Sequence, residues 1–91
     1  MSADNPTYLR DRELLEAELG DELVALDVDE GLCFGFNDVA TAIWRLLREP
    51  RTLAGLVEQL TDDYEVAPDE CRSDTLAALE ILQKHRLVRA I

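Results

Sequence analysis

The segment Gly31–Trp44 most constrains the fold, because its pattern changes from that of a strand to that of a helix with no linker between them. Leu32, Phe34 and Phe36 alternate with smaller residues, which is the period of two expected of a half-buried strand. After Asn37 the apolar residues recur at helical spacing instead. The strand and the helix must therefore share one core.

The helix that follows has a recognisable start and end. Asn37 is a favoured N-cap, and Asp38 places negative charge beside the positive end of the helix dipole. We expect the helix to run from Asp38 to about Arg48 and to end before Pro50. Its apolar stripe consists of Val39, Ala40, Ile43, Trp44 and Leu47.

Two strands are predicted upstream. The leucines between Tyr8 and Leu19 would also allow a helix, but the turn pair Gly20-Asp21 favours a strand over roughly Leu14 to Leu19. The next run, Glu22 to Val28, ends in a second tight turn at Gly31. Together with the strand Leu32–Phe36 these form an antiparallel three-stranded meander. In the middle strand one face carries Val24, Leu26 and Val28.

The second half of the chain reads as helical. Thr52 is a plausible N-cap for a second helix, which should fray near Tyr64. Pro68 suits the first turn of a third helix that runs to about His85. The third helix should bury Thr75, Ala78, Leu79 and Leu82, after which Leu87 and Val88 return to the core as a short extended tail. The predicted fold class is α+β: a winged-helix-like arrangement with a three-stranded antiparallel sheet followed by three helices.

Length and composition limit the other possibilities. Ninety-one residues suit a single domain, residues 1–91, with residues 1–8 frayed. No apolar run is long enough to cross a membrane and no secretory signal is visible, so a cytoplasmic protein is expected. The two cysteines, Cys33 and Cys71, have neither metal-ligand spacing nor a secreted context, and we interpret both as reduced.

Charge and missing motifs argue against two classes of function. A net charge of −11 disfavours nucleic acid as a partner, because phosphate contacts need clustered Lys or Arg. A winged-helix DNA-binding regulator would carry basic side chains on its third helix. Here acidic residues outnumber basic ones on that helix: Asp69, Glu70, Asp74 and Glu80 against Arg72 and Lys84. Catalysis is not expected either, since one histidine and no phosphate loop or metal-ligand cluster leave no machinery to assemble. We expect no metal and no cofactor.

Several segments resemble one family. They are Gly31–Asn37, Ala42–Trp44, Arg51–Val57, Asp74 and the terminal Leu82 with Leu87-Val88. In order and spacing they are similar to the PqqD-like family of small winged-helix proteins, also called RiPP recognition elements. The resemblance extends from about Leu14 to the C-terminus and is to the stand-alone form.

The resemblance implies a non-enzymatic function. Such proteins hold the leader segment of a ribosomally made, post-translationally modified precursor peptide for an enzyme that modifies or cleaves it. The recognition protein of lasso-peptide biosynthesis, with a leader protease as partner, is the nearest type. The alternative within the family is the chaperone of the pyrroloquinoline quinone precursor peptide. The protein is expected to be a monomer or a weak dimer, because an exposed strand edge could also pair with itself.

The resemblance also implies a binding site. The leader would add as a strand to the edge of Leu32–Phe36, in a groove walled by the third helix. Carried over to this chain, the site residues are Leu32, Cys33, Phe34 and Gly35 on the strand, and Leu76, Leu79, Glu80 and Gln83 on the helix. Gly35 could let a partner backbone approach closely, or it could only relieve crowding against Trp44.

Overall fold

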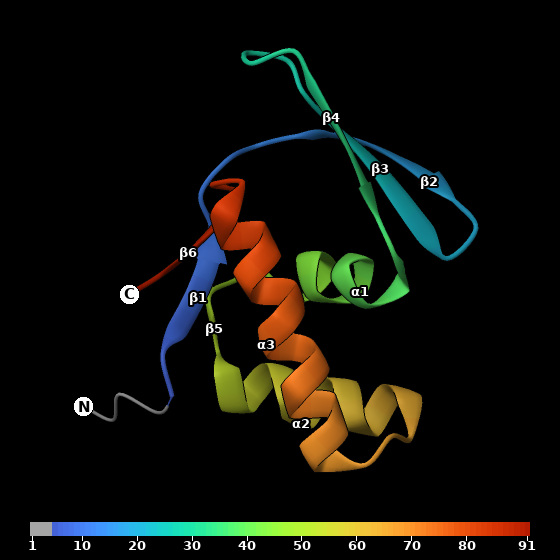
Figure 1. Cartoon of the computed structure of the whole chain (residues 1–91), viewed down its shortest axis with the longest axis vertical. Coiled ribbons are helices and arrows are strands. Elements are labelled where there is room, and N and C mark those ends of the chain that lie inside the picture. Colours follow the sequence, from blue (N-terminus) through green and yellow to red (C-terminus); the bar gives the residue numbers. More distant parts are fainter. Residues whose placement is uncertain (1–4) are drawn as a thin grey trace.

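The computed structural model describes residues 5–91, which form two three-stranded antiparallel sheets and three helices (Figure 1). The first sheet is the expected meander, with its strands in the order β2-β3-β4. The bounds of its strands are Leu15–Leu19 for β2, Glu22–Asp27 for β3 and Leu32–Phe36 for β4. The predicted sheet, its strand order and the helices after it are confirmed.

The turns of the meander have the predicted chemistry. Gly20 and Gly31 both have a positive φ, a conformation that glycine adopts without a steric penalty. In the second turn the backbone N–H of Gly31 donates to the carbonyl oxygen of Asp27 at 2.8 Å. The Asp27 carboxylate is buried and pairs with Arg12, with 2.7 Å between guanidinium nitrogen and oxygen. This ion pair ties the hairpin to the chain segment that precedes β2.

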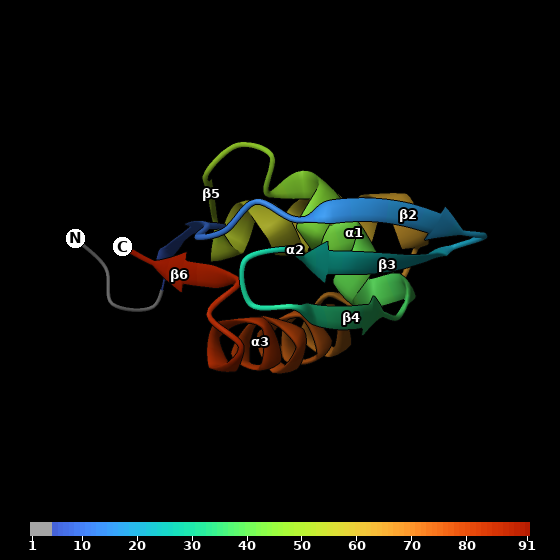
Figure 2. The same ribbon diagram turned by 90° about the horizontal axis from the view of Figure 1, so that it is seen from above.

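The face of β3 that points into the core is not the face that carries its larger apolar side chains. Leu23, Ala25 and Asp27 are buried, whereas Leu26 and Val28 are exposed. In the register of the sheet Leu23 lies opposite Phe36 and Ala25 opposite Phe34, so the same face of β4 also points inward. The helices cover this face, and Figure 2 looks onto the other one.

The three helices begin where the sequence predicts, α1 and α2 after a capping side chain and α3 at Pro68. They span Asp38–Leu46 (α1), Leu53–Tyr64 (α2) and Pro68–Lys84 (α3). Asn37 accepts from the backbone N–H of Ala40 at 2.9 Å, and Thr52 accepts from that of Gly55 at 3.1 Å. Each cap satisfies an N–H that the first helical turn leaves without a partner.

The second sheet is not among the sequence predictions. Its central strand is β1, Thr7–Arg10, flanked by β5, Arg51–Thr52, and by β6, Val88–Ala90. The prediction that residues 1–8 are frayed is therefore wrong at Thr7 and Tyr8, and Tyr8 is only 6% exposed. Residues 1–4 lie outside the described part of the chain. The predicted return of Leu87 and Val88 to the core is confirmed, since both are buried.

Arg10 connects this second sheet to the meander and to α1. Its Nε donates to the carbonyl oxygen of Trp44 at 3.1 Å, and its guanidinium carbon lies 4.2 Å from the centre of the Trp44 ring. A guanidinium nitrogen lies 3.6 Å from the carboxylate of Glu16, which also accepts from the Trp44 indole N–H at 3.1 Å. Burial lowers the pKa of Arg10 and Glu16 opposes that shift. The guanidinium remains charged at neutral pH.

Candidate functional site

The strand β4 is an edge strand that lies beside α3 (Figure 2). In residues 5–91 it pairs with β3 alone, so the backbone groups along its other side have no strand partner. A groove of about 560 Å³ follows that side. Its walls are β4 itself, the start of α1 and the C-terminal half of α3. The lining residues are Leu32, Cys33, Phe34, Gly35, Phe36, Asn37, Ala40, Ala78, Ile81, Leu82, His85 and Leu87.

The side chains of β4 contribute unequally to the groove. Leu32 and Cys33 are exposed, Phe34 is half-buried and Phe36 belongs to the core. Phe34 meets His85, the C-cap residue of α3, edge to face, with 5.4 Å between the ring centres. This contact joins the two walls of the groove. All four predicted strand residues, including Gly35, line the groove.

The site residues predicted on the third helix lie outside this groove. Leu79 is only 1% exposed and belongs to the core, while Leu76, Glu80 and Gln83 are exposed but are not among the residues that line the groove. The groove residues on this side are instead Ala78, Ile81 and Leu82 of α3 and its C-cap residue His85.

The predicted residues and the groove-lining residues have the same spacing, but the second set is shifted by two positions along the chain. Two residues correspond to about 200° around a helix, so the prediction selected nearly the opposite face. The sequence signal for this side of α3 was the apolar pair Ala78 and Ile81. In the structure the small Ala78 leaves room beside β4, and Ile81 is 59% exposed although it is apolar.

The other chemistry-bearing side chains near the groove are few. Cys33 and Cys71 are both free thiols; Cys33 is exposed in the groove, and Cys71 is buried, with its Sγ 3.7 Å from the carbonyl oxygen of Val57. Residues 5–91 contain no group of three or more His, Cys, Asp or Glu side chains placed to hold a metal ion. None of the helices in that range has the length and hydropathy needed to span a membrane.

Comparison with known proteins places this chain in a family. The model of the family described as coenzyme PQQ synthesis protein D (PqqD) matches residues 22–88. The chain belongs to the PqqD family. The matched segment contains β3, β4 and all three helices, and therefore both walls of the groove. The strands β1 and β2 precede it.

A solved structure agrees with the membership in the PqqD family. The structure of TbiB1 in complex with the TbiA(beta) leader peptide superposes with a TM-score of 0.75 and 26% sequence identity. The match covers 89% of this chain and 94% of TbiB1. No curated protein sequence matches the chain.

The surroundings of Gly35 allow a first prediction about this PqqD-family chain. A Cβ atom at Gly35 would meet no atom within 4 Å, so the glycine does not relieve crowding against Trp44. We expect Gly35→Ala to raise the free energy of unfolding by about 0.5–1 kcal/mol, because alanine loses less backbone entropy on folding. Urea unfolding followed by circular dichroism measures this change. A loss of more than about 1 kcal/mol would show instead that the position is sterically constrained.

Proposed function

We propose that this protein is a non-enzymatic cytoplasmic adaptor that recognises the leader segment of a ribosomally made, post-translationally modified precursor peptide. The leader adds as a strand to the free edge of β4 and rests its apolar side chains in the groove between β4 and α3. The adaptor then presents the leader to a protease or to another modifying enzyme.

The observation that carries this proposal is the position of the free edge of β4 directly along an apolar groove. An unpaired edge offers main-chain hydrogen bonds in a fixed register, and adjacent pockets select alternate side chains. The strand β4 contains no Pro, Lys or Arg, which are the residues that commonly protect edge strands from pairing. The groove is therefore suited to an extended peptide with apolar residues at alternate positions.

The relatives support the same class of ligand. TbiB1 shares the fold and was solved with a leader peptide bound. For the finer identity we propose a lasso-peptide precursor, with a leader protease as the partner enzyme. The family description favours a second candidate, the chaperone of the pyrroloquinoline quinone precursor peptide.

The charge of the protein supports a leader that carries basic residues. A net charge of −11 would attract Lys or Arg in the peptide and would accelerate association more than it tightens the complex. The same charge opposes duplex DNA. Asp69, Glu70, Asp74 and Glu80 of α3 are all exposed, so this helix would be repelled by phosphates.

The test is a titration of the protein with synthetic leader peptides, followed by amide chemical shifts. We expect shifts to concentrate on residues 32–36 of β4 and on residues 78–85, which end α3 and include its C-cap. The expected dissociation constant is micromolar or below, which corresponds to about −8 kcal/mol or better. Titrations with a lasso-type leader and with a quinone-cofactor leader separate the two candidates.

A scrambled leader of the same composition is the control for charge attraction. If the scrambled peptide binds as tightly as the natural one, or if the shifts fall on β2 rather than β4, strand addition at this groove is wrong.

A further inference from the structure

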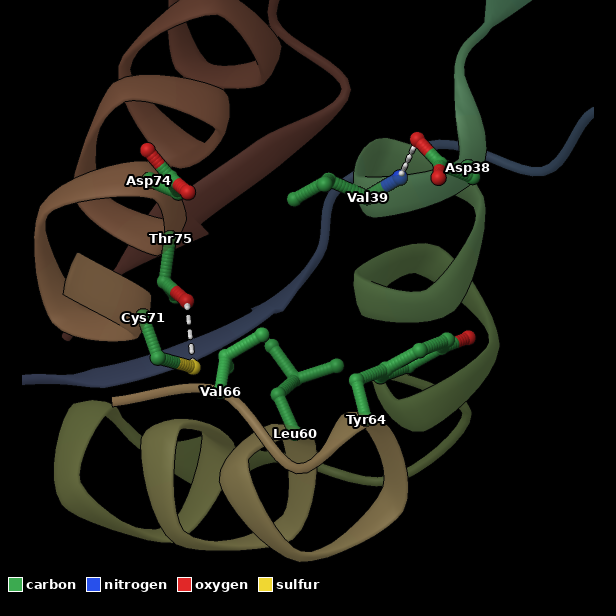
Figure 3. A pocket seen from close by; sticks show the side chains of 8 residues that line it. All are labelled: Asp38, Val39, Leu60, Tyr64, Val66, Cys71, Asp74 and Thr75. Atoms are coloured by element: carbon green, nitrogen blue, oxygen red, sulfur yellow. Dashed lines mark hydrogen bonds between the residues drawn. The ribbon is translucent and has the colours of Figure 1, made fainter. Parts of the chain in front are cut away.

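A second, smaller cavity lies where the three helices meet (Figure 3). Its volume is about 150 Å³. Residues from α1, from α2, from the loop after α2 and from the N-terminal half of α3 line it. They are Asp38, Val39, Leu60, Tyr64, Val66, Cys71, Asp74 and Thr75.

The interior of this helix-junction cavity is apolar. Leu60, Cys71 and Thr75 of its wall are buried, and the polar atoms of the last two already face each other, with 4.0 Å between Sγ and Oγ1. An apolar cavity of ~150 Å³ is large enough to admit a benzene-sized group. The interior therefore suits a hydrocarbon chain rather than a polar group.

The rim of the cavity is acidic. The carboxylates of Asp38 and Asp74 are exposed and lie on one side of the cavity, while Leu60, Tyr64 and Val66 cover the other side (Figure 3). None of the described residues that line the cavity is basic. One oxygen of Asp38 already accepts from the backbone N–H of Val39 at 2.9 Å, so Asp74 is the rim acid that we assign to the ligand. A side chain that lies across the apolar wall and ends beside Asp74 needs a hydrocarbon stem and a positive end, which describes lysine and arginine.

The cavity continues the groove beyond the end of β4. Asn37 lines the groove, and Asp38, the next residue, lines the cavity. On α3 the cavity uses Cys71, Asp74 and Thr75, and the groove continues from Ala78 at the same helical spacing of three and four residues. A peptide on the edge of β4 thus passes from the groove to the cavity near Phe36.

We infer that the cavity binds a lysine or arginine side chain of the leader, located just N-terminal to the segment that pairs with β4. The inference rests on the proposed function and specifies its ligand further. The N-terminal side follows from antiparallel pairing, the orientation that β3 already has with β4, because the start of an antiparallel peptide lies opposite the end of β4.

The test varies both the peptide and the protein. Synthetic leaders carry lysine, or its uncharged analogue norleucine, at each of the positions that flank the paired segment on either side. They are titrated against the wild type, Asp74→Asn and Glu80→Gln. The Glu80→Gln variant is the matched control, because Glu80 is an exposed acid of the same helix that does not line the cavity.

We expect one N-terminal flanking position at which lysine binds about three- to tenfold more tightly than norleucine, an effect typical of a partly desolvated charge contact. Asp74→Asn should remove that preference, and Glu80→Gln should preserve it. The amides of Val39 and Val66 should shift only with the lysine peptide.

The outcomes distinguish a failure of the cavity inference from a failure of the proposed function. If the leaders bind on β4 but lysine gives no advantage over norleucine at any N-terminal position, the cavity inference is wrong and the proposed function stands. Equal effects of Asp74→Asn and Glu80→Gln also overturn the inference, because they would indicate general charge attraction. If no leader binds, the proposed function fails and the inference fails with it.

Discussion

Replacing Ile81 by glutamine should weaken leader binding about four- to twentyfold, because an incoming peptide can cover the exposed part of the Ile81 side chain. Fully burying an isoleucine is worth about 1.5–3 kcal/mol, and the 59% of Ile81 that is still exposed corresponds to about 0.9–1.8 kcal/mol, where 1.4 kcal/mol is a factor of ten in affinity. Glutamine keeps the helix propensity and the net charge, so folding and electrostatic attraction stay nearly unchanged. Isothermal titration with the leader peptide measures the effect.

Leu76→Gln is the matched control for Ile81→Gln. Leu76 is an apolar residue of the same helix, 38% exposed, but it lies outside the groove. We expect it to change affinity less than about twofold. If Leu76→Gln weakens binding more than Ile81→Gln does, the peptide contacts the face of α3 that the family resemblance indicated, and the groove described above is not the binding site.

Arg10→Met should lower the free energy of unfolding by about 2–4 kcal/mol, since one side chain supplies a hydrogen bond, an ion pair and a cation–π contact. Methionine retains the hydrocarbon stem but leaves the Trp44 carbonyl without this donor and Glu16 without its cation. For a domain of this size such a loss is a large part of the total stability. Chemical denaturation of the variant and the wild type measures it.

Arg89→Met tests whether charge removal alone explains the effect of Arg10→Met. Arg89 also belongs to the second sheet, but its ion pair with Asp11 is 3.4 Å long and its side chain is 58% exposed. Such surface pairs contribute about 0–1 kcal/mol. Comparable losses in the two variants would mean that the contacts of Arg10 with Trp44 add little.

Local signals were sufficient to predict the meander and the helices. Asn37 and Thr52 cap their helices as expected, and Gly31 has the positive φ that its turn needs. Each of these features depends on residues that are close in the sequence. The change of period at Asn37 located the junction of β4 and α1 for the same reason.

The second sheet could not be predicted in the same way. Tyr8 pairs with Ala90 and with Arg51, which are distant in the sequence, and the strand β5 has only two residues. No turn or alternating run signals such a pairing. Tyr8 and Val88 belong to the same buried cluster as Trp44 and the apolar residues of the helices, so burial in the shared core, not a local signal, favours these strands.

The faces of individual elements were the other feature that the sequence left open. Hydrophobicity favours the side of β3 that carries Val24 and Leu26, yet the helices pack on the side with Leu23 and Ala25. Asp27 makes the buried face of β3 hard to recognise from the sequence, because a carboxylate is not expected in a core. Its partner Arg12 lies on another segment. Likewise, the face of α3 toward β4 depends on how the helix crosses the sheet, so the sequence alone did not point to Ala78 and Ile81 as lining the groove.

The central place of β1 in the second sheet has a consequence for folding during synthesis. One of its partners, Val88–Ala90, leaves the ribosome about 80 residues after Thr7, at roughly 5–20 residues per second. Until then one edge of β1 lacks its hydrogen-bonding partner, and closing so long a loop carries an entropic cost. The nascent chain can form the meander and the first helix early, but it acquires its complete stability only after its last strand has been made.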